Sequence, residues 1–208
     1  MTLKNILTQN GKLRKTSKAT GLRCFNFSIP AYKSLSGKVT CPFAKDCVKY
    51  CYAQKSFYKI PRNMQYQEER YELTKRSDFV DIMLQEIVSK RADVIRIHDA
   101  GDFYNVRYIH KWFEIANELP EVRFYAYTKS ISLFKLDTIK DIIPENMDII
   151  FSEGSKTDSL IDFDRDRHAR IFKKHEDLLS AGYVSSMDND LLATKWFTDN
   201  NKIGLVFH

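Results

Sequence analysis

The sequence is poor in the residues and segments that mark unusual classes of protein. Its 208 residues include only 7 glycines and 5 prolines, with no repeat, no low-complexity segment and no linker rich in either residue. This composition excludes a collagen-like or disordered chain. No run of about 18 apolar residues occurs, which excludes a membrane-spanning helix. The first residues lack the apolar core of a secretory signal, so we expect a cytoplasmic protein with no membrane partner.

Common catalytic motifs are also missing. The sequence contains no phosphate-binding loop, no G-x-S-x-G nucleophile motif and no zinc-protease helix motif. The charge balance of 33 Lys and Arg against 27 Asp and Glu gives a net charge of +6. This excess is compatible with a nucleic-acid or nucleotide partner but does not require one.

Cysteine is scarce, and its placement is the most informative feature of the chain. The first of the four cysteines is Cys24, and the others, Cys41, Cys47 and Cys51, form a C-x5-C-x3-C pattern. A reducing cytoplasm disfavours disulfides, so this spacing favours metal or cluster ligation. Structural zinc normally takes four ligands from paired knuckles, whereas three thiolates on a four-iron cluster leave one iron open. We therefore predict a 4Fe-4S cluster, with zinc or metal-free thiols as alternatives, and expect Cys24 in the core.

Strand-like and helix-like segments alternate along the rest of the chain. Residues 1–20 predict a basic, irregular N-terminal arm, and residues 21–208 predict a single α/β domain. About six βα units are too few for a closed eight-stranded barrel, so the pattern predicts an open, partial parallel βα barrel or a doubly wound sheet. A long loop, residues 31–61, carries the clustered cysteines. Expected strands are 24–29, 93–98, 122–127, 147–151, 182–186 and 202–207, and expected helices are 62–91, interrupted at 77–78, 104–119, 131–143 and 163–179.

Polar residues follow the predicted strands, where ligands bind in sheets of this kind. His98 is predicted to be an acid–base group or a fourth iron ligand, and Asp99 and Asp102 to act in catalysis or to bind a cofactor amine or ribose. Asp102 as the cap of the next helix is the alternative. Gly101 allows a cofactor to approach the backbone closely. Later strand ends supply the remaining predicted cofactor-binding residues, which are Thr128, Ser130 and Ser152.

Two resemblances extend this interpretation. The string TCPFAKDCVKYCYAQ, with FNFSIPA before it and IRIHDAGDFYNVRYIHKWFEIANELPEVRFYAYTKS after it, resembles the phage gene product 88 family. That resemblance implies a phage-encoded protein in the host cytoplasm. The Cys-Tyr-Ala end of the loop and the partial-barrel pattern are similar to radical S-adenosylmethionine enzymes, although the usual spacing there is C-x3-C-x2-C. This second resemblance implies a cluster on Cys41, Cys47 and Cys51, and binding of the cofactor's methionine part by residues 100–102.

Three functional hypotheses follow. The first is an iron–sulfur enzyme similar to radical S-adenosylmethionine enzymes, acting on a nucleotide, nucleic acid or peptide with an external electron donor. The second is a non-catalytic phage accessory protein in which a cluster or zinc is structural and a basic surface binds nucleic acid or a host protein. The third is a cluster enzyme that uses an open iron as a Lewis acid without S-adenosylmethionine.

Overall fold

The computed structural model describes residues 6–207, and its framework is a seven-stranded, all-parallel sheet. The sheet curls into an open half-barrel, which confirms the predicted partial barrel. Its strand order is β1-β2-β3-β4-β5-β7-β6, so neighbouring strands are consecutive in the chain except at the last edge. The strands are β1 (Cys24–Phe27), β2 (Val94–Ile97), β3 (Arg123–Thr128), β4 (Met147–Ser152), β5 (His168–Phe172), β6 (Val184–Ser185) and β7 (Lys202–Val206).

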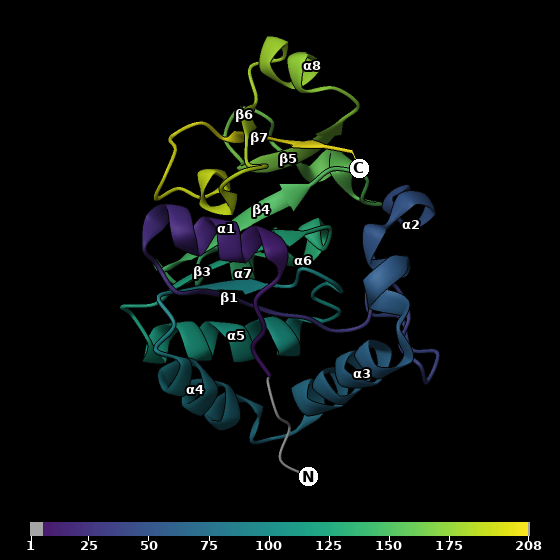
Figure 1. Cartoon of the computed structure of the whole chain (residues 1–208), viewed down its shortest axis with the longest axis vertical. Helices are drawn as coiled ribbons and strands as arrows, with labels where there is room; N and C mark the ends of the chain where they lie inside the picture. The colour runs from purple at the N-terminus through teal and green to yellow at the C-terminus, as the bar shows by residue number, and fades with distance from the viewer. Residues whose placement is uncertain (1–5, 208) are drawn as a thin grey trace.

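Helices cover both faces of this sheet. Helices α4 and α5 lie along one face, and α1 lies across the other (Figure 1). None of the described helices is long and apolar enough to cross a membrane. The helices are α1 (Gly11–Thr20), α2 (Cys47–Tyr50), α3 (Pro61–Lys75), α4 (Phe79–Lys90), α5 (Val106–Glu118), α6 (Ile131–Phe134), α7 (Asp137–Lys140) and α8 (His175–Ser180), with 3-10 turns η1 (Tyr52–Gln54), η2 (Ser56–Lys59), η3 (Asp158–Leu160) and η4 (Asp190–Ala193).

Alternation along the strands builds two cores. In β2, Ile95 and Ile97 point outward into a large cluster that contains Trp112 of α5. Val94 points inward, into a smaller cluster that α1 and η4 close with Leu13 and Leu191. The amino end of the half-barrel is therefore filled by side chains, which leaves the carboxyl end of the strands for a ligand.

Three expected segments differ from the structure. Residues 131–143, expected as one helix, form the two short helices α6 and α7. Residues 11–20 of the expected irregular arm form α1, because Leu13 and Thr16 are buried against the sheet and Asn10 caps the helix by accepting from the Leu13 amide. Residues 1–5 of that arm lie outside the described part of the chain.

The prediction of one helix over residues 163–179 is wrong. The strand β5 occupies His168–Phe172, and only α8 is helical. Pairing with β4 on one side and β7 on the other overrides the weak helical pattern.

Candidate functional site

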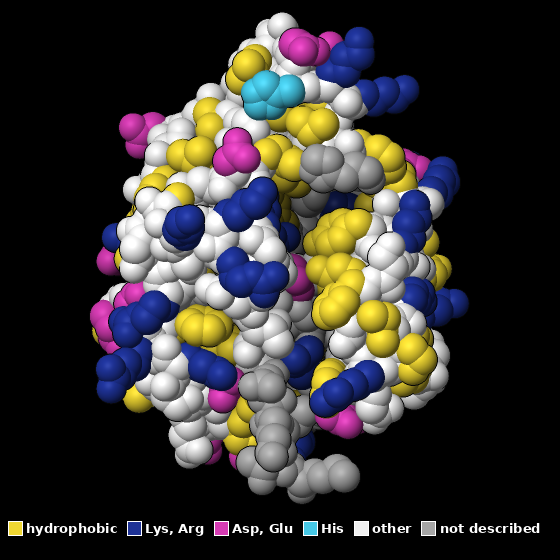
Figure 2. All heavy atoms as spheres, in the orientation of Figure 1, with side chains coloured by type: hydrophobic (Ala, Val, Ile, Leu, Met, Phe, Trp, Pro, Cys, Tyr) yellow, Lys and Arg dark blue, Asp and Glu magenta, His cyan; other side chains and the backbone are white. Residues whose placement is uncertain are grey.

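A cavity of about 380 Å³ opens at the carboxyl end of the strands. It lies between α1 and the segment from α2 to η2. Figure 2 shows a hollow there, with Lys and Arg side chains over α1 on one side and hydrophobic side chains gathered on the other. Its lining comes from the cysteine loop, from the ends of β2, β3 and β4, and from β7. This is the position at which parallel α/β sheets bind ligands.

The three clustered cysteines all line this cavity, whereas the fourth does not. Cys41, Cys47 and Cys51 face it from the loop and from either end of α2. Cys24 is fully buried in the inner core at the opposite end of β1, where burial raises its pKa. The structure therefore separates Cys24 from the other three, as the sequence predicts.

The environment of the thiols bears on whether they fit a metal. Burial, followed by the nearby Asp102 carboxyl and the neighbouring thiols, raises the pKa of Cys41. The Cys41 Sγ also accepts a hydrogen bond from the Tyr32 amide at 3.2 Å. Burial raises the pKa of Cys47, but the Lys129 ammonium opposes that shift.

Three soft donors on one wall fit a thiolate-ligated centre, because a cation relieves the repulsion between neighbouring thiolates. Over residues 6–207, however, no three His, Cys, Asp or Glu side chains are arranged so that they could hold a metal ion. Binding of a single metal ion by the three thiols would therefore require these side chains to move.

Asp99 holds the cysteine loop against the end of β2. Its carboxylate accepts from Asn10 Nδ2 at 3.0 Å, from Tyr58 OH at 3.1 Å and from the Ser28 hydroxyl. The Tyr52 hydroxyl donates to the backbone carbonyl of Asp99. With three protein donors on the carboxylate, the geometry favours a positioning role for Asp99 over an acid–base role.

Asp102 joins the loop after β2 to the end of β3. Its carboxylate accepts from Thr128 Oγ1 at 2.6 Å, from the Lys129 amide at 2.8 Å and from the Phe103 amide at 2.7 Å. Burial nevertheless raises its pKa. Asp102 does not cap α5, because Asn105 accepts from the Tyr108 amide at 2.8 Å and takes that position. The alternative capping assignment for Asp102 is therefore wrong.

His98 lies at the edge of the cavity, but its ring packs in the outer core. The residue adopts a left-handed conformation with φ of 67°, which turns it out of the alternation of β2. Its ring contacts Phe103 edge-on, with centroids 4.8 Å apart, and its Nε2 lies 2.9 Å from the Tyr108 hydroxyl. Burial lowers its pKa to about 3. A ring that stays neutral at pH 7 among aromatic side chains favours a structural role.

The predicted cofactor-binding residues divide into two groups. Gly101 and Ser152 line the cavity, as does Asp102. Gly101 has φ of 85°, and a Cβ there would lie 2.2 Å from Ile29 Cγ1, so its glycine is required by close packing as well as by conformation. Thr128 and Ser130 are buried, and Ser130 Oγ donates to the Phe103 carbonyl at 2.6 Å. Their observed hydrogen bonds connect loops.

Sequence reasoning missed an ion cluster in the cavity wall. Arg96 projects inward from β2, where it meets Asp190 of η4 and Lys12 of α1. The signal was a charged residue in the middle of the apolar run 94–97, but its partners are 84 or more positions away in the sequence.

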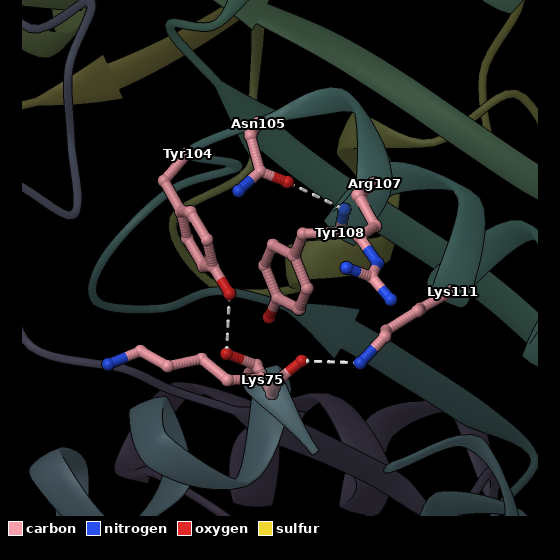
Figure 3. A pocket seen from close by; sticks show the side chains of 7 residues that line it. Lys75, Tyr104, Asn105, Arg107, Tyr108 and Lys111 are labelled. Atoms are coloured by element: carbon pink, nitrogen blue, oxygen red, sulfur yellow. Dashed lines mark hydrogen bonds between the residues drawn. The ribbon is translucent and has the colours of Figure 1, made fainter. Parts of the chain in front are cut away.

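A second, smaller hollow of about 160 Å³ lies between the end of α3 and the start of α5 (Figure 3). Its polar groups are largely engaged with one another. The Lys111 ammonium donates to the Thr74 and Arg76 carbonyls at the end of α3, and the Tyr104 hydroxyl lies 2.7 Å from Thr74 Oγ1. The Lys75 ammonium pairs with Glu72. This hollow is a joint between helices, so the larger cavity is the candidate site.

The family described as Gene product 88 matches this chain over residues 1–206. The chain belongs to the gene product 88 family. The Gene 88 protein of Mycobacterium phage L5 is 30% identical to this family member over 102 residues, which are 43% of this chain and 43% of the phage protein. The match thus spans less than half the length of that relative. No solved structure matches the chain.

Proposed function

We propose that this gene product 88 family member is an iron–sulfur enzyme of the radical S-adenosylmethionine type. The observation that carries the proposal is that Cys41, Cys47 and Cys51 come from one loop and face one cavity at the carboxyl end of a parallel half-barrel. The substrate would be a nucleotide, a nucleic acid or a peptide.

The chain's own residues would have separate tasks in this proposal. The three thiolates would hold the cluster, and Gly101, packed against Ile29, would form part of the cavity wall beside a bound cofactor. Asp99 would keep the cysteine loop in place through Tyr52 and Tyr58. A bound cluster would supply the single electron that cleaves the sulfonium of S-adenosylmethionine, with that electron coming from an external donor.

Anaerobic purification and reconstitution with iron and sulfide test the proposal. We expect a brown protein that absorbs near 400 nm and is bleached by dithionite, and that releases 5′-deoxyadenosine when reductant and S-adenosylmethionine are added. Cys47→Ala should lose the absorbance and the bound iron, because two thiolates remain.

Cys24→Ala is the matched control, because Cys24 is buried away from the cavity. It should keep the wild-type iron content. Equal iron loss in both variants, or a colourless wild-type protein with stoichiometric zinc, would contradict the cluster. A cluster without release of 5′-deoxyadenosine would instead favour the enzyme that uses no S-adenosylmethionine.

The surface of α1 supports a second candidate function. Arg14, Lys15 and Lys18 are exposed on this helix beside the cavity. A basic helix of this kind suits an accessory protein that binds nucleic acid, with zinc or a cluster in a structural role. Binding to a duplex that weakens steeply with salt, in a protein without 5′-deoxyadenosine release, would favour this candidate.

A further inference from the structure

Two cations share one carboxylate in the wall of the cavity. Asp190 Oδ1 accepts from Lys12 Nζ at 2.6 Å, and Asp190 Oδ2 accepts from Arg96 Nη1 at 2.8 Å. Asp190 also accepts from the Tyr125 hydroxyl at 2.7 Å and lies 3.4 Å from the Tyr127 hydroxyl. Burial opposes the ionisation of Asp190, but Arg96 and Lys12 outweigh it and hold its pKa well below the usual range. Burial lowers the pKa of Lys12, and with Lys12 and Arg96 both protonated the three side chains carry one unit of positive charge in excess.

This excess charge faces the cavity. Arg96 and Lys12 both line it, while Asp190 is fully buried behind them. The Arg96 side chain is only 12% exposed, and its Nε has no hydrogen-bond partner among the described residues. A buried guanidinium donor without a partner is costly, and an oxyanion is the group that guanidinium binds best.

Asp190 is the carboxylate that forms ion pairs with Arg96 and Lys12 among the described residues, and Asp188 also attracts the Lys12 ammonium without an ion-pair contact. The carboxylates of Asp99 and Asp102 each accept three hydrogen bonds from protein donors, described above. The Lys129 ammonium donates to Ser152 Oγ at 2.6 Å, on the side of Cys47.

We propose that Arg96 and Lys12 form a subsite for an oxyanion, a phosphate or a carboxylate, of the ligand that occupies the cavity. Aromatic side chains give the rest of that ligand an apolar surface to contact; they include Tyr52, Tyr58, Tyr127 and Phe207. The ligand class is therefore a compact molecule with an aromatic body and an anionic group. The subsite rests on the proposed function for the identity of the cavity as the ligand site, but it needs no metal.

Paired probes separate the two sources of the oxyanion. Binding to the full chain, before and after reconstitution with iron and sulfide, is measured by calorimetry for AMP against adenosine, and for N-acetyltyrosine against N-acetyltyrosine amide. We expect the anionic member of at least one pair to bind about tenfold or more tightly than its neutral partner. A preference in the first pair identifies phosphate, and one in the second pair identifies carboxylate.

Variants assign the preference to the subsite. Arg96→Gln should abolish it, while Arg62→Gln, on the exposed surface of α3, should leave it unchanged. Arg96→Gln leaves buried Asp190 with Lys12 as its one cationic partner, which could destabilise the protein. The fold of this variant is therefore checked by circular dichroism. Lys12→Gln is the second variant, since the Arg96–Asp190 pair remains, and it should weaken the preference about threefold or more.

Three results would overturn the subsite: no binding of any probe at millimolar concentration, equal affinity within both pairs, or a preference that survives in both Arg96→Gln and Lys12→Gln. These failures are distinct from failure of the proposed function. A protein that takes up no iron but prefers AMP keeps the subsite and loses the cluster. A protein that forms the cluster without any preference loses only the subsite.

Discussion

At the scale of single residues, the left-handed conformation of His98 explains why a histidine at the end of β2 packs in the core. Alternation alone would place it on the inner face with Arg96, toward the cavity. With φ of 67° its ring turns instead toward Phe103 and Tyr108. The hydrogen bond to Tyr108 and the aromatic contacts are then available, at the expense of a conformation that side chains other than glycine seldom adopt.

This packing predicts a pH dependence of stability. Burial lowers the pKa of His98 from 6.5 to about 3, so between these values the unfolded chain binds a proton that the folded chain excludes. The free energy of unfolding should therefore fall as the pH decreases below about 6.5, by about 2 kcal/mol from this group at pH 5. Urea unfolding at pH 7 and pH 5 measures the effect.

His98→Asn is the matched variant, because asparagine tolerates the left-handed region and does not titrate. Its loss of stability between pH 7 and pH 5 should be smaller than that of the wild type by about 2 kcal/mol. The same loss in both proteins would contradict a buried, neutral His98.

At the scale of secondary-structure elements, close packing of α8 on the sheet depends on a glycine in β7. A Cβ at Gly204 would lie 2.2 Å from the Leu178 side chain, which is fully buried under α8. Gly204→Ala should therefore lower the free energy of unfolding by about 1–3 kcal/mol, measured by urea titration.

Gly11→Ala is the control for this change. The nearest atom to a Cβ at Gly11 is Arg14 Nη2 at 4.0 Å, so the substitution should alter stability by no more than about 0.5 kcal/mol. If Gly204→Ala were equally neutral, α8 would not be packed on β7 as described.

The elements also show where sequence patterns succeed and where they fail. The outward pair Ile95 and Ile97 and the amphipathic face of α5 are local patterns, so the sequence predicted both elements. The segment 163–179 has no strong local pattern, and its strand β5 exists because β4 and β7 hydrogen-bond to it on both sides. Strand formation of that kind depends on partners distant in the chain.

At the scale of the whole molecule, α1 is part of the barrel's interior. Leu13 is fully buried in the inner core, and Lys12 and Thr16 contact Asp190 of η4. Residues near the start of the chain and near its end therefore close the same end of the half-barrel, which makes one cooperative unit the expected behaviour.

Leu13→Ala tests whether α1 and the sheet unfold as one cooperative unit. The cavity it leaves should lower the free energy of unfolding by about 2–5 kcal/mol, and amide exchange should accelerate in β3 as well as in α1. Lys15→Ala, on the exposed face of α1, should change neither. Accelerated exchange confined to α1 would indicate an arm that folds separately from the sheet.

The sequence by itself determined the parallel α/β class and the division of the cysteines, because alternation within strands and the spacing within one loop are local properties; the curl of the sheet settled a half-barrel over a doubly wound sheet. It also located the polar strand ends at 98–102. Only the tertiary structure decided what those groups do. Donors from other segments occupy the carboxylates of Asp99 and Asp102, an arrangement that favours a positioning role. The ion cluster of Lys12, Arg96 and Asp190 also depends on tertiary structure. Its two ion pairs join residues 178 and 94 positions apart in the sequence, and only the curl of the sheet brings them together.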